Sequence, residues 1–337
     1  MSLFKKKMKI LVTGSKGFVG KHLLQGLRKN NYHATGLYRS KNNGENQENL
    51  IDCDLRDKST LDSVLKDFDI VFHCAGKVGD YGSWSEYYNN NYIASKNIIE
   101  ACSKNKVDKI IHLSSQTVYG IHPFDKKILV EDDPITIQEQ DWAMYTKSKQ
   151  MTEHLFTKDF KDKINFTIFR PGIIYGPEDF NFLPRYIDFS RKNILIGGGN
   201  NSFNLIYIEN LVNQLIDVGL NDNGNNEIYN VCDEPNLSQK EVHKVISEKL
   251  GNEKKPIKIP YPLAFYAASI YENIHQFMNT KSPLLVSKYG VYIIANQNRL
   301  DSTKINNEFD SAKDIAPRDA LDKTLGWYDQ NTKVLKY

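Results

Sequence analysis

The sequence predicts an α/β fold, in which a doubly wound parallel sheet takes up most of the chain and a smaller C-terminal lobe follows. Short apolar runs alternate with helical patterns up to about residue 169, which is typical of parallel strands joined by helices. A glycine-rich turn separates the first strand from the first helix. Beyond Pro177 the alternation becomes irregular. We therefore expect residues 1–177 to form the sheet domain and residues 178–337 to form the lobe, interleaved with it.

The composition is that of a globular protein in water. The 337 residues are 25% charged and 40% apolar, and the formal net charge of +3 gives no sign of nucleic-acid binding. No apolar stretch approaches the roughly 20 residues of a membrane span, and the apolar run at residues 10–12 is too short to predict a signal peptide. The four cysteines have neither paired nor metal-ligand spacing. This favours reduced thiols in the cytoplasm and no metal site.

The glycine-rich turn at residues 14–20 lies between a strand expected at residues 9–13 and a helix expected at residues 21–29. Glycines there permit a tight turn, close approach of a diphosphate to the backbone, and packing of the helix on the strand. Free amides at the helix N-terminus could hold the phosphates. The spacing is GxxGxxG and not the usual GxGxxG, so a purely structural turn is the alternative.

The second strand, expected at residues 33–38, is followed by Arg39. Enzymes that prefer NAD often place a carboxylate there, on the ribose 2′-hydroxyl. A guanidinium suits a 2′-phosphate instead, because its donors match the phosphate oxygens. Arg39 therefore favours NADP over NAD, and an ordinary solvated arginine is the alternative.

The sheet domain continues in the same rhythm. Further strands are expected at residues 49–55, 70–74, 109–115 and 165–169, and further helices at residues 58–66, 85–104 and 141–160. Ala75 and Gly76 follow the strand that ends at Cys74, and their small side chains let a flat ring lie close to the backbone. Ligands of such sheets bind at the carboxyl ends of the strands. A binding site is therefore expected beside Ala75 and Gly76.

Tyr145 and Lys149 lie four residues apart, hence on one face of the helix expected at residues 141–160. A positive charge beside a phenol favours tyrosinate and lowers a pKa that starts near ~10. Such a phenol can exchange a proton with a substrate hydroxyl or carbonyl. An ordinary solvated helix face is the alternative. Ser114 and Ser115, which end a strand at the same sheet edge, favour the catalytic interpretation.

The lobe is expected to contain helices at residues 180–192, 209–220, 238–250 and 260–278, and strands at residues 204–208 and 227–231. The last of these helices is apolar over a broad face, which favours a core helix. A lid over an apolar substrate, or contact with a membrane surface, is the alternative.

Taken in order, these motifs resemble the extended short-chain dehydrogenases/reductases, the superfamily of NAD-dependent epimerases and dehydratases. The resemblance implies a Rossmann-type fold with a substrate-binding C-terminal lobe. It rests on the glycine turn at residues 13–20, Asp54-Leu55, the segment at residues 73–76, Ser114-Ser115 with Val118-Tyr119-Gly120, Tyr145 with Lys149, Arg170-Pro171-Gly172, and the segment at residues 207–210.

By this resemblance Tyr145 is the general acid/base, Lys149 lowers its pKa and binds the nicotinamide ribose, and Ser115 holds the reacting oxygen. The resemblance also implies the cofactor contacts: Gly14, Gly17, Phe18 and Val19 at the diphosphate, Asp54 and Leu55 at the adenine, Ala75 and Gly76 at the ribose and nicotinamide, and Pro171 nearby. It implies a homodimer as well, paired through the helices near residues 91–104 and 145–160.

Within the superfamily, the aromatic loop at residues 77–84 and the segments at residues 282–284 and 325–328 resemble the 3β-hydroxysteroid dehydrogenase-like branch. The leading hypothesis is hydride transfer between NADP or NAD and a secondary alcohol or ketone. A nucleotide-sugar 4-epimerase that keeps NAD bound is the alternative, and the residues that could hold its substrate's diphosphate are Arg185, Lys192, Asn201 and Arg299. A non-catalytic NADP-sensing protein is a third hypothesis. Gln116-Thr117 stands where dehydratases commonly carry Asp-Glu, which argues against dehydration.

Overall fold

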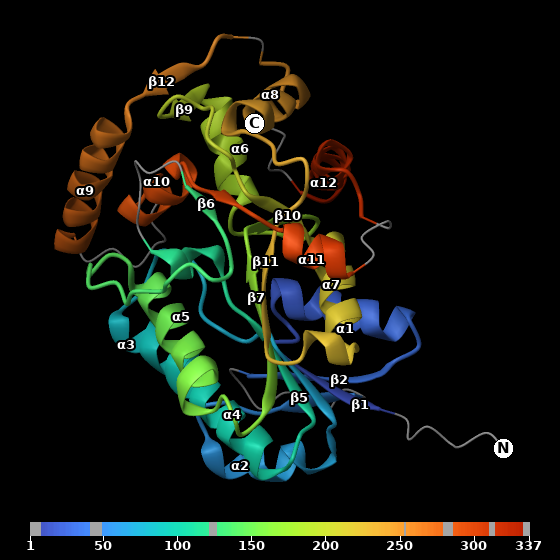
Figure 1. Cartoon of the computed structure of the whole chain (residues 1–337). Coiled ribbons are helices and arrows are strands. Elements are labelled where there is room, and N and C mark those ends of the chain that lie inside the picture. The colour runs from blue at the N-terminus through green and yellow to red at the C-terminus, as the bar shows by residue number, and fades with distance from the viewer. Residues whose placement is uncertain are drawn as a thin grey trace.

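A seven-stranded parallel sheet forms the centre of the computed structural model, which describes residues 8–40, 49–120, 127–252, 254–278, 286–309 and 314–332 (Figure 1). The strand order is β11-β7-β5-β4-β1-β2-β3, and every neighbouring pair is parallel. The strands are β1 (Lys9–Thr13), β2 (His33–Tyr38), β3 (Leu50–Asp52), β4 (Ile70–His73), β5 (Lys109–Leu113), β7 (Asn165–Pro171) and β11 (Glu227–Val231). The predicted doubly wound parallel sheet is confirmed.

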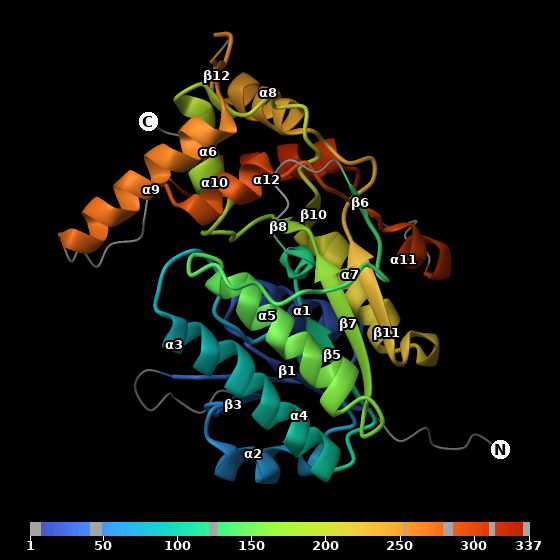
Figure 2. The same cartoon turned by 60° about the vertical axis from the view of Figure 1, so that its left-hand side comes forward.

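Helices cover both faces of this sheet, as the burial of its strands requires. β5 is buried along its whole length, and so is β1 after Lys9. One face packs against α1 (Phe18–Lys29) and α7 (Ile208–Gly219). Helices α2 (Lys58–Val64), α4 (Ala94–Lys104) and α5 (Met144–His154) cover the other face (Figure 2).

Two predicted helices are interrupted by wider helical turns. The helix expected at residues 85–104 consists of α3 (Trp84–Tyr87), a π-helical segment η2 (Tyr88–Ile93) and α4. The helix expected at residues 141–160 begins later, with α5, and ends in the π-helical segment η4 (Leu155–Asp159). Such segments recur at functional sites, and η2 carries Asn91, a buried residue beside the candidate site.

Residues beyond Pro177 contribute to two parts of the molecule. β11 and α7 belong to the central sheet and its helical layer. The other elements gather beyond the carboxyl ends of the sheet strands (Figure 1). They are α6 (Leu183–Arg191), α8 (Gln239–Lys249), α9 (Tyr261–Phe277), α10 (Lys288–Ala295), α11 (Thr303–Glu308), α12 (Pro317–Asn331) and the parallel pair β9 (Ile194–Ile196) with β12 (Ile257–Ile259). Two more short strands of this part, β10 (Leu205–Tyr207) and β13 (Arg299–Leu300), pair in parallel with β8 (Ile173–Tyr175) and β6 (Ile128–Leu129), which precede Pro177.

Helix α9 is buried on one face and exposed on the other. Its inner face packs against α10, where Ala268 is buried beside Val291 and Ala295. Its outer face leaves large apolar side chains exposed, which differs from the predicted core helix. Residues 282–284, which support the branch resemblance, lie outside the described residues.

Candidate active site

A cavity of about 450 Å³ opens at the carboxyl ends of the central strands, between the sheet and helices α6 and α10. Nine of the predicted site residues line it: Gly14, Gly17, Phe18, Val19, Gly76, Ser115, Tyr145, Lys149 and Pro171. Four others are not among its lining residues: Arg39, Asp54, Leu55 and Ala75. The structure therefore brings the predicted catalytic residues together with the glycine turn.

The glycine turn fits a diphosphate. Gly14 has φ +68°, and a Cβ there would lie 2.8 Å from the Cα of Ala75. A Cβ on Gly20 would lie 2.3 Å from the carbonyl oxygen of Gly14. Helix α1 can therefore approach the turn this closely only because residue 20 has no side chain. Gly17 is the N-cap of α1 and provides no side-chain cap, which leaves the helix amides directed at the cavity. These free amides are the donors that a bound diphosphate uses.

The Ser115 hydroxyl and the Tyr145 phenol are neighbours in this cavity, and both side chains line it. Ser115 is the N-cap of the 3-10 turn η3 (Gln116–Tyr119), and its Oγ accepts hydrogen bonds from the amide and hydroxyl of Thr117 at 3.3 and 3.2 Å. The Tyr145 ring is held edge-on between Tyr87 and Tyr289, with centroids 6.5 and 6.3 Å away. Two groups that can hydrogen-bond one substrate oxygen are thus fixed side by side.

Lys149 is buried and anchored to the end of β5, where its Nζ donates to the carbonyl oxygen of Leu113 at 2.7 Å. Burial lowers the pKa of Lys149 to about 8, while Cys74 and Glu153 act in the opposite direction. Burial raises the pKa of Tyr145 to about 12, and the neighbouring Ser115 hydroxyl only partly offsets this. The net shift of the Tyr145 pKa in this structure is therefore upward and not downward, because desolvation of the phenol dominates.

Ser114 and Ser115 have different surroundings. The Ser114 hydroxyl donates to the carboxylate of Glu153, which forms a buried ion pair with Arg170 at 2.8 Å. Arg170 also donates to the Tyr119 hydroxyl at 2.9 Å, and that hydroxyl donates to Asn230 at 2.6 Å. This polar network links α5, which carries Lys149, to β7 and η3. Glu153 escaped the sequence analysis, although it lies one helical turn after Lys149.

Asn91 is a second residue that the sequence analysis missed. Its side chain accepts from the Lys77 amide at 2.6 Å and donates to the Lys77 carbonyl oxygen at 3.0 Å. It also donates to the Ser148 hydroxyl at 2.8 Å, which ties the loop after β4 to α5. A Cβ on Gly76 would meet Asn91 Oδ1 at 3.2 Å and Lys149 Nζ at 3.7 Å, so Gly76 keeps the space beside the lysine open.

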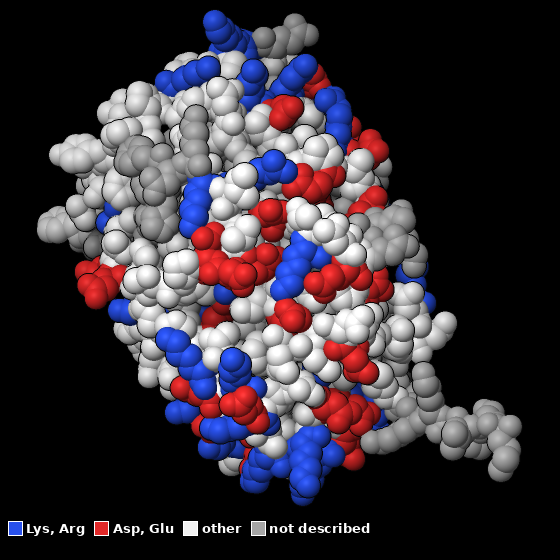
Figure 3. All heavy atoms as spheres, viewed as in Figure 1, with Lys and Arg blue, Asp and Glu red and all other residues white. Residues whose placement is uncertain are grey.

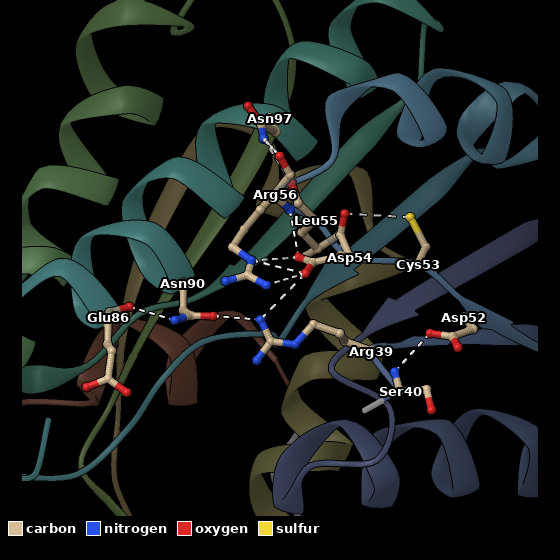
Figure 4. Close-up of polar contacts among 10 residues, drawn as sticks. All are labelled: Arg39, Ser40, Asp52, Cys53, Asp54, Leu55, Arg56, Glu86, Asn90 and Asn97. Atoms are coloured by element: carbon tan, nitrogen blue, oxygen red, sulfur yellow. Dashed lines mark hydrogen bonds and ion pairs between the residues drawn. The ribbon is translucent and has the colours of Figure 1, made fainter. Parts of the chain in front are cut away.

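Arg39 and Asp54 meet outside the cavity, beyond the ends of β2 and β3 (Figure 4). Arg39 is half exposed, donates to Asn90 at 2.8 Å and lies 3.8 Å from Asp54. Arg56 grips the same carboxylate, and its hydrogen bonds hold the pKa of Asp54 below the usual value. Lys16, from the glycine turn, lies 3.5 Å from the ring centroid of Tyr38. Two guanidinium groups therefore contact one carboxylate at this edge, and Lys16 is a third cation beside the end of β2.

The wall opposite the sheet is largely apolar and contains one ion pair. It includes Phe182, Phe189, Val286, Tyr289, Ile293 and Ile294. Arg185 on α6 binds Asp80 at 3.0 Å, and Asp80 also accepts a hydrogen bond from Ser287.

Of the four residues proposed to grip a diphosphate, only Arg185 lines the cavity. Asn201 donates to backbone carbonyl oxygens of Ile294 and Asn296, and Arg299 pairs with Glu234. Lys192 is not a lining residue.

The described part of the chain lacks two further structural features. Its His, Cys, Asp and Glu side chains form no group of three or more that could hold a metal ion. None of its helices combines the length and the apolar character needed to cross a bilayer.

Comparisons with known proteins agree with this geometry. The N-acetyl-α-D-glucosaminyl-diphospho-ditrans,octacis-undecaprenol 4-epimerase of Escherichia coli O157:H7 is 26% identical over 332 residues, covering 94% of both chains. The decarboxylating sterol-4-α-carboxylate 3-dehydrogenase of Mus musculus is 28% identical over 307 residues, covering 85% of this chain and 83% of the mouse protein. The structure of UDP-glucuronic acid 4-epimerase from Bacillus cereus in complex with NAD superposes with a TM-score of 0.73, at 22% identity over 96% of this chain and 99% of that one.

The model of the NAD dependent epimerase/dehydratase family matches residues 10–232, a span that includes the glycine turn, Ser115, Tyr145 and Lys149. The protein belongs to this family and is an enzyme of the extended short-chain dehydrogenase/reductase type.

Proposed function

We propose that the protein is an NADP-dependent oxidoreductase that interconverts an apolar secondary alcohol and its ketone. The observation that carries this proposal is the juxtaposition of Ser115 and Tyr145 in a cavity that also contains Lys149 and the open N-terminus of α1. The nicotinamide, when bound, supplies or accepts the hydride. The protein's own residues hold the reacting oxygen and move the proton.

Each member of the Ser-Tyr-Lys group has a distinct role in this proposal. Tyr145 exchanges a proton with the substrate oxygen as general acid in reduction and general base in oxidation. Ser115 hydrogen-bonds the same oxygen from the neighbouring position. Lys149, fixed by Leu113 and facing the space beside Gly76, is placed to bind the ribose. In reduction the raised pKa of Tyr145 suits a group that must carry its proton at neutral pH.

The cavity wall supports an apolar substrate. Its aromatic and aliphatic residues on α6 and α10 offer contact area but few polar partners. The mouse relative, named as a sterol dehydrogenase, would need such a wall. We therefore place sterol-like and other bulky ketones first among candidate substrates.

A 4-epimerase is the second candidate, and Arg185 is the observation that favours it. A guanidinium at the cavity wall could hold a diphosphate, as the substrate of the E. coli relative would require. The pairing of Arg185 with Asp80, and the engagement of Asn201 and Arg299 elsewhere, argue against it.

The preference for NADP rests on Arg39. Its half-exposed guanidinium, with Lys16 and Arg56 nearby, offers positive charge to a 2′-phosphate. Asp54 is already held by Arg56, which reduces its repulsion of an incoming phosphate. NAD, which the Bacillus cereus epimerase binds in its complex, is the alternative cofactor.

A substrate panel tests the proposal. NADPH oxidation is followed with sterol ketones, smaller ketones and, in parallel, UDP-sugars analysed for epimerisation. We expect ketone-dependent oxidation that Tyr145→Phe abolishes and Tyr175→Phe retains, since Tyr175 is a buried tyrosine whose hydroxyl bonds Pro317. If a UDP-sugar is epimerised without net change in NADPH and no ketone reacts, the protein is a 4-epimerase and the oxidoreductase proposal is wrong.

The assembly and location are part of the proposal. We propose a homodimer built on α4 and α5, which lie together on one face of the sheet (Figure 2). Light scattering coupled to gel filtration would give twice the chain mass if this is correct. We also propose a cytoplasmic location, because the four cysteines are unpaired.

A further inference from the structure

Helix α9 is apolar on both of its faces but packs through only one. The inward residues include Ala264, Phe265 and Ala268, which contact α10 and its neighbours. The outward residues form a stripe along the whole helix: Leu263 (60% exposed), Tyr266 (68%), Ile270 (45%), Ile274 (53%) and Phe277 (93%), continued by Met278 (65%). A helix that is apolar all round is normally buried, so an outward stripe of this length indicates a surface that is covered by something else.

The stripe projects from the body of the protein. Figure 2 shows α9 extending away from the sheet domain, with α10 between it and the rest of the chain. In Figure 3 a largely uncharged surface lies at the upper left, over α9, and Lys or Arg side chains gather at the top, near β12. Apolar and basic surfaces therefore adjoin.

The exposed charged side chains that the structure describes from residue 254 to the end of α9 are lysines. Lys254, Lys255 and Lys258 are exposed just before α9, together with Ile257, which is 63% exposed on β12. From residue 254 to residue 278 the sequence holds a single acid, Glu272. That acid is only 8% exposed and is neutralised by Lys288, whose Nζ lies 3.2 Å away. Nothing acidic on α9 would repel an anionic surface.

We propose that α9 and β12 form a membrane-docking surface that lies on the face of a bilayer containing anionic phospholipids. The aromatic and aliphatic stripe would enter the headgroup boundary, while the lysines contact lipid phosphates. Shallow, in-plane binding suits a helix whose other face is occupied by α10.

This surface lies next to the cavity. Tyr289, Val291 and Ile294 of α10 line the cavity, and Val291 and Ile294 also belong to the apolar cluster that includes Ala268 of α9. An apolar molecule dissolved in the bilayer would therefore face the wall of the active site. The docking proposal does not depend on which reaction the site performs.

Vesicle flotation with the full chain tests the proposal. The fraction bound to phosphatidylcholine vesicles is compared with the fraction bound to vesicles that also contain phosphatidylglycerol. We expect binding to the anionic vesicles that falls as NaCl is raised. Ile270→Ser with Phe277→Ser should lower the partition coefficient at least about tenfold, because both side chains would leave the lipid. Lys254→Glu with Lys258→Glu should lower it at least about tenfold on anionic vesicles alone.

Matched variants distinguish binding through this surface from nonspecific adsorption to vesicles. Ile128→Ser with Phe180→Ser removes the same residue types from exposed positions elsewhere, 58% and 68% exposed, and should leave partitioning unchanged. Lys29→Glu with Lys158→Glu, at exposed positions far from α9 in sequence, makes the same change in net charge and should have at most a small effect. Circular dichroism confirms that each variant is folded.

Three outcomes would overturn the proposal. The first is no binding to anionic vesicles, and the second is equal loss in the matched variants. The third is that the α9 variants bind vesicles as the unaltered protein does but differ from it in self-association. The stripe would then be a contact surface for a second copy of the chain.

Discussion

The Ser115 hydroxyl and the Tyr145 phenol line one cavity as neighbours, one from the end of a strand and the other from the start of a helix. Because both groups can reach one substrate oxygen, removing the phenol hydroxyl should remove proton transfer. Tyr145→Phe should lower kcat by at least about 10²-fold. Binding of NADPH, measured by fluorescence titration, should stay within about twofold. Unchanged turnover would favour a cofactor-sensing protein.

The two adjacent serines provide a matched pair for the same site. Ser115→Ala should lower kcat about tenfold or more, because a donor to the reacting oxygen is lost. Ser114→Ala should instead lower the free energy of unfolding by about 1–3 kcal/mol, since it leaves Glu153 short of a buried partner. Steady-state kinetics and urea unfolding on both variants check the distinction. Equal kinetic losses would contradict the assignment of Ser115 alone.

The fold could be predicted from local patterns, because buried parallel strands are continuous apolar runs that glycines and helices punctuate. The position of Ser115 beside Tyr145 followed from the family resemblance, and the structure places both in one cavity. Arg170 was recognised as a motif residue, but its partner Glu153 was not. An ion pair between a helix and a strand depends on tertiary packing that no local spacing encodes.

Other features depended on context in the same way. Asn91 acts through a π-helical turn, which hydrophobic periodicity does not distinguish from an ordinary helix. The direction of the pKa shift of Tyr145 depended on the extent of burial, which the Tyr/Lys spacing does not give. The exposure of α9 could not be foreseen either, because an apolar helix face looks the same in sequence whether it is covered or not.

Arg39 should decide the choice of cofactor. If its guanidinium holds a 2′-phosphate, Arg39→Ala should raise the Kd for NADPH about 10–100-fold, as expected for loss of hydrogen bonds between charged groups. The Kd for NADH should change little, because it has no phosphate at that place. Arg28→Ala, which removes a guanidinium bound to backbone carbonyl oxygens of Ala34 and Asn49, is the control. Tighter binding of NADH than NADPH by the unaltered protein would contradict the proposal.

The buried pair of Arg170 and Glu153 should be a large contributor to stability only while both partners are present. Arg170→Met leaves Glu153 charged and buried, and should lower the free energy of unfolding by about 3–5 kcal/mol. Arg191→Met removes a partly exposed ion pair with Asp188 and should cost about 1 kcal/mol or less. Urea unfolding at pH 7 measures both. Similar losses in the two variants would contradict the burial argument.

His112 should make the protein sensitive to mild acid. Neither ring nitrogen has a hydrogen-bond partner within the described structure, and the ring stacks on Phe156 with centroids 5.0 Å apart. Burial, with Lys149 and His73 nearby, holds the pKa of His112 well below 6.5. The unfolded chain therefore takes up a proton below about pH 6.5 that the folded chain refuses, so stability is present above that pH and is lost as pH falls.

His112→Phe should remove this loss while keeping the stacked ring. When the pH falls from 7.5 to 5, the free energy of unfolding should drop by about 2 kcal/mol less in the variant than in the unaltered protein. This difference is the cost of keeping one group unprotonated about 1.5 pH units below its unfolded pKa. Urea unfolding at both pH values measures the difference. His33→Phe, at an exposed position at the start of β2, should leave the pH dependence unchanged. An equal dependence in the His112 variant and the unaltered protein would show that the ring accepts its proton in the folded state.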